Sequence, residues 1–254
     1  VTGVQTCAFR SSLKLDADRP VALTAAEVPR VRAEAAKLES EQPHTLYRMT
    51  KAARMFEEVA RATPQDFEAQ WKAAEVISFV AENGVDKDSR AQAAKTGIAL
   101  ARRARELTPD RVEGHYWYAI NVGLLADVDR SYGLNAVAEI EAAIKRAGEL
   151  DERYDYAGPL RVLGVLHLRT PAPPVSIGSA RKGLRLLERA ATLFPGYPEN
   201  QLYLAEALRD NDRRDEACQL VRQVLAAPAW PGRQAESETW RAAARKLLSC
   251  AEKK

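Results

Sequence analysis

A pattern of small or apolar residues recurs five times along the chain and constrains its fold more than any other feature. In each copy these residues stand at positions i, i+4 and i+7, and a residue that ends a helix follows at or near position i+12. The copies begin at Ala52, Gly97, Ile140, Gly183 and Ala217, and their stops are Pro64, Pro109, Glu152, Pro195 and Pro228. Residues at this spacing share one narrow face of an α-helix, and a proline just beyond it stops the helix. Each copy therefore predicts one helix that packs along a single apolar face.

A second set of small residues follows the stops and predicts a partner for each helix. Ala74, Ala119 and Ala205 lie ten residues beyond three of the stops, and Gly164 takes the matching place two residues late. The string around Ala119, HYWYAINV, echoes the W-x2-L-G-x2-Y string of the tetratricopeptide repeat (TPR), in which a small residue allows close helix contact. The strings around the other three share its register, so the chain is expected to form TPR-like helical hairpins.

The expected fold is all-α, because alternating β-branched runs, which predict strands, are absent. We predict a TPR-like α–α superhelix of about four to five helical hairpins with enlarged inter-helix loops. Compared with a plain TPR hairpin, the first three carry 11, 9 and 7 extra residues, around residues 83–90, 127–134 and 170–178. Helices predicted over residues 25–40 and 234–251 are expected to cap the two ends.

Residues 1–20 are predicted to be a disordered or artefactual tail, and residues 21–254 a single TPR-like domain. The first seven residues, VTGVQTC, have neither the basic start nor the apolar core of a signal peptide, and they resemble a translated sequencing adaptor. A native disordered tail is the alternative. The longest run without Asp, Glu, Lys or Arg covers 13 residues, 114–126, so no transmembrane segment is predicted.

Charge and cysteine usage argue against several kinds of partner. The formal net charge of +3 is too small an excess to predict binding to nucleic acid. Cys7, Cys218 and Cys250 are odd in number and widely spaced, which argues against a disulfide framework and against a zinc site. We therefore expect no nucleic-acid partner, no metal ion and no cofactor.

No catalytic group can be assembled from the sequence. His44, His115 and His167 fall in separate segments, and no nucleophile with a nearby base accompanies any of them. His167 occupies the tyrosine position of its repeat, where a packed or hydrogen-bonded ring is expected. A Gly-rich phosphate-binding loop is also absent from the sequence. The chain is therefore predicted not to be an enzyme.

The register of the repeats predicts which residues line a ligand or partner groove, because TPR proteins line theirs with fixed positions of each first helix. Positions 5 and 9 of the four first helices are Trp71, Glu75, Tyr116, Ile120, Arg161, Val165, Leu202 and Glu206. An apolar centre with a few polar groups suits an enclosed small molecule. The alternative is that Trp71, Tyr116 and Leu202 pack against one another or against a capping helix. The Lys and Asn with which other TPR modules clamp chaperone tails are absent from these positions, so such tails are not expected partners.

Three strings resemble the TatT family, the TPR partner subunit of TRAP-type transporters, and more distantly the regulator of microtubule dynamics proteins. They are HYWYAINVG at 115–123, AGPLRVLGVLHLRTPAPPVSIG at 157–178 and YPENQLYLAEAL at 197–208. The resemblance implies a periplasmic protein, free or lipid-anchored, that handles an apolar or amphipathic small molecule beside a transporter's solute-binding protein. The alternative is a general TPR scaffold that mediates protein–protein interaction in an envelope assembly. Either function is compatible with an oligomer.

Overall fold

The computed structural model describes residues 23–231 and 233–251, and the tail predicted over residues 1–20 lies outside them. Within these ranges the regular structure is entirely helical, as expected for the predicted all-α fold. The helices are α1 (Val28–Ser40), α2 (Leu46–Ala62), α3 (Phe67–Asn83), α4 (Lys87–Leu107), α5 (Val112–Val128), the short 3₁₀ helix η1 (Arg130–Tyr132), α6 (Gly133–Leu150), α7 (Tyr154–Arg169), α8 (Ala180–Leu193), α9 (Pro198–Asp210), α10 (Arg214–Ala226) and α11 (Gln234–Ala251). No helix in the described ranges is long and apolar enough to span a bilayer.

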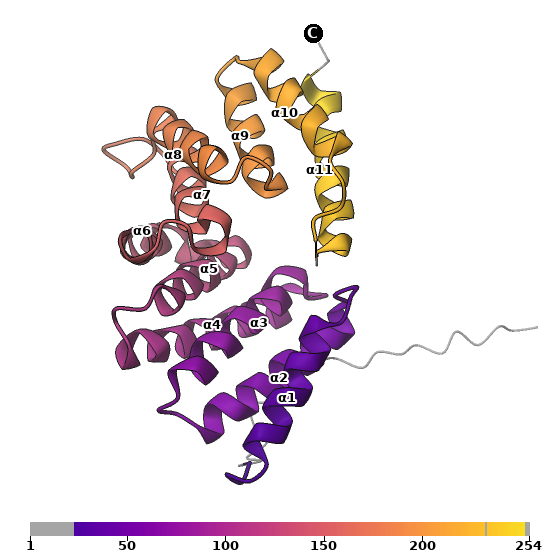
Figure 1. Cartoon of the computed structure of the whole chain (residues 1–254). Coiled ribbons are helices and arrows are strands. Elements are labelled where there is room, and N and C mark those ends of the chain that lie inside the picture. Colours follow the sequence, from indigo (N-terminus) through magenta and orange to yellow (C-terminus); the bar gives the residue numbers. More distant parts are fainter. Residues whose placement is uncertain (1–22, 232, 252–254) are drawn as a thin grey trace, which may run out of the picture.

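Neighbouring helices pack as hairpins that stack into a curved superhelix (Figure 1). The pairs are α1 with α2, α3 with α4, α5 with α6, α7 with α8, and α9 with α10, and α11 packs against both α9 and α10. The first helices α3, α5, α7 and α9 lie toward the inner side of the curve, and α4, α6 and α8 lie toward the outside (Figure 1). The TPR-like superhelix predicted from the repeats is therefore observed.

The two predicted capping helices have different roles in the structure. The helix expected over residues 25–40 is α1, and it pairs with α2 to form the first hairpin. The helix expected over residues 234–251 is α11, which covers α9 and α10 at the other end. The extra residues of the hairpins also differ in their structure. Those of the α3–α4 hairpin lengthen its helices, so that α4 reaches 21 residues, whereas those of the α7–α8 hairpin form the loop 170–179.

Short polar side chains start several of the helices, as local sequence predicts. Thr45, Asp66, Asp86 and Ser179 each accept a hydrogen bond from a backbone N–H in the first turn of α2, α3, α4 and α8. Such caps satisfy donors that have no partner inside the helix, and each typically contributes about 1 kcal/mol. In α4, Ser89 also accepts from the backbone N–H of Asp86, which completes a capping box.

The residue six positions after a proline stop links one hairpin to the next. Gln70, His115 and Gln201 each lie six residues after a proline stop. Their side chains hydrogen-bond to backbone carbonyls in the last turn of the preceding helix or just beyond it: those of Ala60 (2.7 Å), Pro109 (2.9 Å) and Pro195. Carbonyls at a helix end lack partners within the helix, so this bond links each hairpin to the next at a defined distance.

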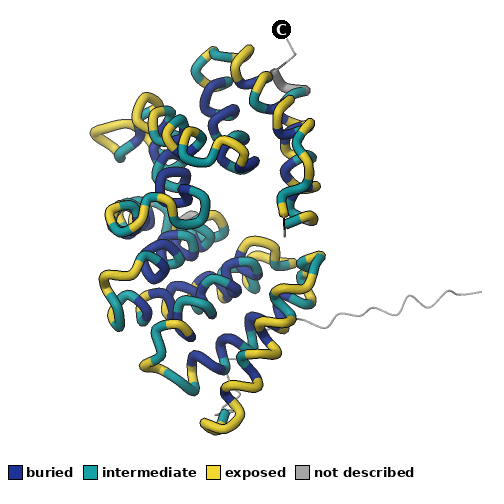
Figure 2. The backbone as a smooth tube through the Cα atoms, viewed as in Figure 1, coloured by how far each residue is buried: buried dark blue, intermediate teal, exposed yellow. Residues whose placement is uncertain are grey.

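The core is rich in alanine and forms two main clusters, one in the N-terminal hairpins and one in the C-terminal hairpins and α11 (Figure 2). Helix α7 contributes to both, because Val162 and Leu166 pack against the first cluster and Val165 and Leu168 against the second. This helix therefore joins the two halves of the superhelix.

Close contact between α7 and α8 depends on Gly164 and Gly183, two of the small residues of the repeat pattern. A Cβ atom at Gly183 would lie 2.7 Å from Cγ of Leu168 and 2.8 Å from the carbonyl oxygen of Gly164. Backbone atoms cannot move aside as the end of a flexible side chain can, so any larger residue would push the helices apart.

We predict that Gly183→Ala lowers the free energy of unfolding by about 1 to 3 kcal/mol, the usual cost of overpacking. The matched control is Gly133→Ala, because a Cβ atom there meets nothing within 4 Å. The control is expected to be neutral or to stabilise by up to about 1 kcal/mol through better helix propensity. Urea denaturation followed by circular dichroism measures both, and equal stability of the two variants would contradict the prediction.

Candidate functional site

Helix α7 begins with a turn of left-handed backbone. Asp155, Tyr156 and Ala157 have φ values of 46°, 54° and 65°. Residues with a side chain avoid this region, at a cost of about 1 to 2 kcal/mol each. Such conformations persist only where surrounding contacts impose them, and they are concentrated at functional sites. The contacts around this turn therefore define the first part of the candidate site.

Arg161 holds the turn from one side. Its Nη1 donates to the carbonyl oxygens of Asp155 (3.3 Å) and Tyr156 (3.4 Å), and its Nη2 donates to Oδ2 of Asp155 at 2.7 Å. Asn200, from α9, accepts from Nη1 of Arg161 at 2.9 Å and donates to the carbonyl of Tyr156 at 2.8 Å. The guanidinium is buried, with a side-chain exposure of 5%, so these bonds replace the water that it loses.

Tyr116, from α5, holds the turn from the other side. Its hydroxyl donates to Oδ2 of Asp155 at 2.6 Å. Burial raises the pKa of this hydroxyl well above its usual value, and the charge of Asp155 adds to the effect, so the group stays a proton donor. A Cβ atom at position 158 would lie 2.5 Å from the Tyr116 oxygen, which explains the glycine there. Pro159 then starts the regular part of the helix, since proline fits a first turn.

These contacts give a structural role to two of the sequence strings that resemble the TatT family. The first string contains AGPLR, which includes the last residue of the left-handed turn and Arg161. The second contains YPEN, which includes Glu199 and Asn200. Oε2 of Glu199 lies 3.4 Å from Nη2 of Arg161. The structure thus brings together two of the predicted groove residues, Tyr116 and Arg161. Sequence reasoning missed Asp155 and Asn200. The Gly-Pro pair of the first string and the Pro-Glu-Asn of the second were the available signals.

The other predicted groove residues are spread over the inner helices, and their use as a groove stays a prediction. Trp71 and Glu75 are half-buried on α3, and the Trp71 indole donates to Glu68 at 2.7 Å. Ile120, Val165 and Glu206 are partly exposed. Tyr116 and Leu202 are buried, with exposures of 2% and 9%, and Leu202 belongs to the C-terminal core. The two carboxylates of the set, Glu75 and Glu206, are thus more accessible than Tyr116 and Leu202, whereas Arg161 is buried at 4% exposure.

Carboxylates from four helices form what we call the inner acidic face: Glu39 of α1, Glu75 and Glu82 of α3, Asp155 of α7 and Glu199 of α9. Each of two cations forms ion pairs with two of these carboxylates. Lys72 donates to Glu39 (2.7 Å) and Glu75 (2.6 Å), and Arg161 pairs with Asp155 and Glu199. Among the described residues, no cation forms an ion pair with Glu82. The five carboxylates of the face thus outnumber the two cations that pair with them, while the charge of Arg90 acts on Glu82 and that of Arg233 on Asp155 and Glu199 without an ion pair.

The carboxylates of this face repel one another across the superhelix. The pKa of Glu75 is raised, mainly because protein surrounds the carboxyl, and the charges of Glu39 and Asp155 add to the rise. The pKa of Glu82 is raised for the same reason, with Glu199 as the strongest neighbouring charge. Glu82 and Glu199 lie 117 positions apart in the sequence, so the curvature of the superhelix creates this repulsion.

Two contacts place α11 beside this face, and the second of them joins the two ends of the superhelix. Tyr197 stacks on Tyr156 with ring centroids 4.4 Å apart and meets Trp240 of α11 edge to face, which helps to dock α11. Nδ1 of His44, in the turn between α1 and α2, lies 3.2 Å from Oε1 of Glu236 at the start of α11. The chain therefore curves until its last helix meets its first hairpin (Figure 1).

The histidines contribute to structural bonds in the described part of the chain. His44, His115 and His167 each hydrogen-bond to a backbone carbonyl, those of Glu39, Pro109 and Ile177. Burial lowers the pKa of His115 and so favours its neutral form. No three His, Cys, Asp or Glu side chains of the described residues are grouped to hold a metal ion. Cys218 is a free thiol.

We predict that Arg161→Ala lowers the free energy of unfolding by about 3 to 5 kcal/mol, because Asp155 and the turn carbonyls lose a buried partner. Arg189→Ala is the control. It removes an ion pair with Glu152, but the Arg189 side chain is 59% exposed, so a loss of at most about 1 kcal/mol is expected. Urea denaturation of the two variants tests the comparison, and a loss of the same size in both would refute the structural role of Arg161.

The raised pKa of Glu82 predicts a stability that depends on pH. A carboxyl with a raised pKa in the folded state destabilises the folded protein when it ionises, so the full loss of stability is present above the folded pKa. Below the unfolded pKa of 4.5 the carboxyl is protonated in both states and this loss disappears. Glu82→Gln should therefore stabilise the protein at pH 7 by less than about 1 kcal/mol, since the exposed carboxyl is screened by solvent. Thermal unfolding from pH 4 to 7 checks this prediction: the gain should vanish toward pH 4, and a constant gain would contradict it.

Comparison with known proteins agrees with this fold. The family model described as "Regulator of microtubule dynamics protein 1-3" matches residues 33–167. No curated protein matches the chain. Among solved structures, TTC0263, a thermophilic TPR protein of Thermus thermophilus, superposes with a TM-score of 0.62 at 18% identity, over 88% of this chain and 98% of that one. MamA of Desulfovibrio magneticus RS-1 gives a TM-score of 0.47 at 12% identity, over 91% and 100% of the two chains.

The similarity to the Thermus protein shows the TPR fold and no more than the fold. Of the two families that the sequence strings resemble, the one whose model matches is the one expected to be the more distant. Its match covers α1 to α6 almost completely and most of α7, including Arg161. Because the match extends over more than half of the sequence, the chain belongs to the regulator of microtubule dynamics protein 1-3 family.

Proposed function

We propose that this protein is a non-catalytic scaffold that binds a Lys- or Arg-containing segment of a partner protein on its inner acidic face. The observation that supports the proposal most directly is the set of accessible carboxylates on this face that repel one another. Glu75, Asp155 and Glu199 have side-chain exposures of 28%, 26% and 32%, so a partner can reach them.

A basic segment would relieve an unfavourable interaction that exists in the free protein. The pKa of Glu75 and of Glu82 is raised, so each carboxylate is less stable than in water. A lysine or arginine side chain placed between α3 and α9 would reduce the repulsion between Glu82 and Glu199. Such charge complementarity increases the rate of association and the specificity for basic partners.

The fold also suits a chain segment as the ligand. Curved helical repeats present an extended inner surface made by successive first helices. Here the residues of that surface come from α1, α3, α7 and α9. The acidic tails of chaperones, already disfavoured by the missing clamp residues, would meet carboxylates at this face and be repelled.

A narrower function follows from the TatT resemblance: handling an apolar or amphipathic small molecule in the periplasm beside the solute-binding subunit of a TRAP-type transporter. It depends on the sequence strings, and it requires exposed apolar groups at the centre of the groove. Ile120 and Val165 are partly exposed there, whereas Tyr116 and Leu202 are buried. We therefore favour the protein-binding scaffold. Solvent extraction of the purified protein followed by mass spectrometry distinguishes the two, because a co-purifying lipophilic acid would favour the transporter-associated function.

We predict that the double substitution Glu75→Gln/Glu82→Gln weakens binding of a fluorescein-labelled peptide with four lysines and no acidic residue by about three- to tenfold. Fluorescence anisotropy at low and at physiological salt measures the affinity, and wild-type binding should weaken as salt rises. Glu106→Gln is the control, because this carboxylate lies on the outer helix α4 with 56% of its side chain exposed. No binding by the wild type, or an equal loss in the control, would refute the proposal.

A further inference from the structure

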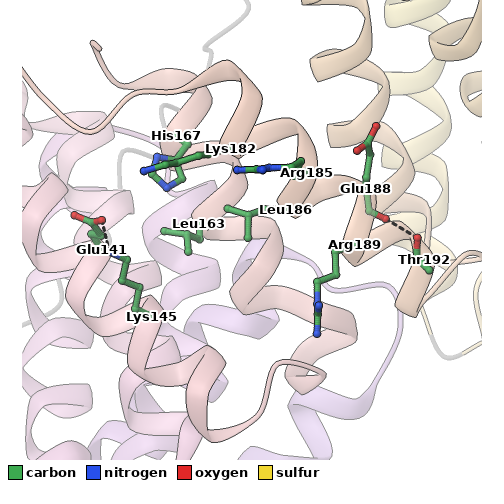
Figure 3. Close-up of a pocket in the computed structure, with 10 residues that line it drawn as sticks. All are labelled: Glu141, Lys145, Leu163, His167, Lys182, Arg185, Leu186, Glu188, Arg189 and Thr192. Atoms are coloured by element: carbon green, nitrogen blue, oxygen red, sulfur yellow. Dashed lines mark hydrogen bonds and ion pairs between the residues drawn. The ribbon is translucent and has the colours of Figure 1, made fainter. Parts of the chain in front are cut away.

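An open groove lies on the other side of the superhelix, between the outer helices α6 and α8 with α7 beneath them (Figure 3). Its volume is about 770 Å³. Leu163 of α7 and Leu186 of α8 form an apolar centre. Binding sites commonly combine such a centre with a small number of charged or polar groups that fix the orientation of the ligand.

Two cations of this groove form no ion pair within the described part of the chain. Lys182 and Arg185 line it, and neither forms an ion pair with any residue in the described ranges. Figure 3 shows both on the same side of the two leucines as His167. A carboxylate held there could pair with both cations while an attached apolar group covers the leucines.

The other charged residues of the groove are already engaged, which explains why these two are available. Nζ of Lys145 pairs with Glu141 at 2.6 Å, and Arg189 pairs with Glu152 of the preceding hairpin at 2.7 Å. Glu188, the acidic residue of α8, pairs with Arg213 at 3.0 Å. No carboxylate of α8 remains for Lys182 or Arg185, so the groove presents a net positive charge.

His167 gives this part of the groove a fixed wall. Its Nδ1 lies 2.9 Å from the carbonyl oxygen of Ile177, and a carbonyl only accepts, so Nδ1 carries the proton in this bond. The bond ties α7 to the loop 170–179, and the backbone N–H of Ser179, the cap of α8, donates to the carbonyl of His167 at 2.8 Å. The start of α8, which carries both cations, is thereby fixed relative to the leucines.

We propose that this groove binds an acidic segment of a partner protein, in which Asp or Glu side chains flank an apolar side chain. Charge complementarity with Lys182 and Arg185 selects the acidic residues, and Leu163 and Leu186 accept the apolar one. The length of α8 between Lys182 and Thr192 is about 15 Å at 1.5 Å per residue, which matches about five residues of extended chain. The open shape suits a peptide lying along the surface better than a small molecule that must be enclosed.

This site is independent of the inner acidic face. The two surfaces differ in the sign of their charge, and they are formed by different helices, apart from α7. The same partner segment could not satisfy both, so the superhelix can hold a basic segment on its inner side and an acidic segment on its outer side at the same time.

A labelled eight-residue peptide with six glutamates and two leucines is the probe, and fluorescence anisotropy at low salt is the measurement. We expect the wild type to bind it and Lys182→Glu/Arg185→Glu to bind it at least about tenfold more weakly. Arg181→Glu is the control, because it reverses the charge of an exposed residue of α8 that does not line the groove. The control should keep most of the wild-type affinity.

Two further arms make the result decisive. Replacing the leucines of the peptide by serines should weaken binding to the wild type, because the apolar contact is lost. Circular dichroism of each variant shows that the helices are intact. Failure of the wild type to bind the acidic peptide would overturn the proposal, as would an equal loss in Arg181→Glu. Binding of decanoate in place of the peptide would also overturn it, because the site would then belong to a small amphiphile. None of these results affects binding of the lysine peptide to the inner face.

Discussion

The buried guanidinium of Arg161 lies at the junction between the two halves of the superhelix and binds groups from both α7 and α9. Helix α7 contacts α5 and α9 at only a few places, yet it joins the two hydrophobic clusters. At this junction the polar bonds of Arg161 to Asp155, Asn200 and Glu199 take the place of extensive apolar packing. They also offset the cost of the left-handed turn, which sets the direction in which α7 leaves the preceding hairpin.

The same network determines the chemistry of the inner side. A buried cation needs compensation, and Arg161 has two carboxylates near it that both remain partly exposed. Lys72 repeats this arrangement nearer the N-terminus, again with two carboxylates. The carboxylates therefore outnumber the cations, and the curvature of the superhelix brings them within range of one another. The carboxylates that compensate the buried Arg161 thus also make the inner side favourable for a basic partner.

The outer side has the opposite character because its charges are distributed differently. Its acidic side chains are engaged in ion pairs between hairpins, as for Glu152 with Arg189 and Glu188 with Arg213. These pairs leave Lys182 and Arg185 beside an apolar surface that the packing of α6, α7 and α8 does not cover. A helical repeat of this size can therefore present two surfaces of opposite charge.

The helices and their pairing follow from local sequence, because the i, i+4, i+7 pattern, the caps and the prolines act over one or two turns. Helices α2, α4, α6, α8 and α10 all end two residues before a predicted stop. The tertiary structure alone decided which inner residues are accessible and which are buried. The left-handed turn depends on the hydroxyl of Tyr116, 39 positions before Asp155, and on the amide of Asn200, 44 positions after Tyr156. Local rules could not predict a conformation that only these long-range contacts stabilise.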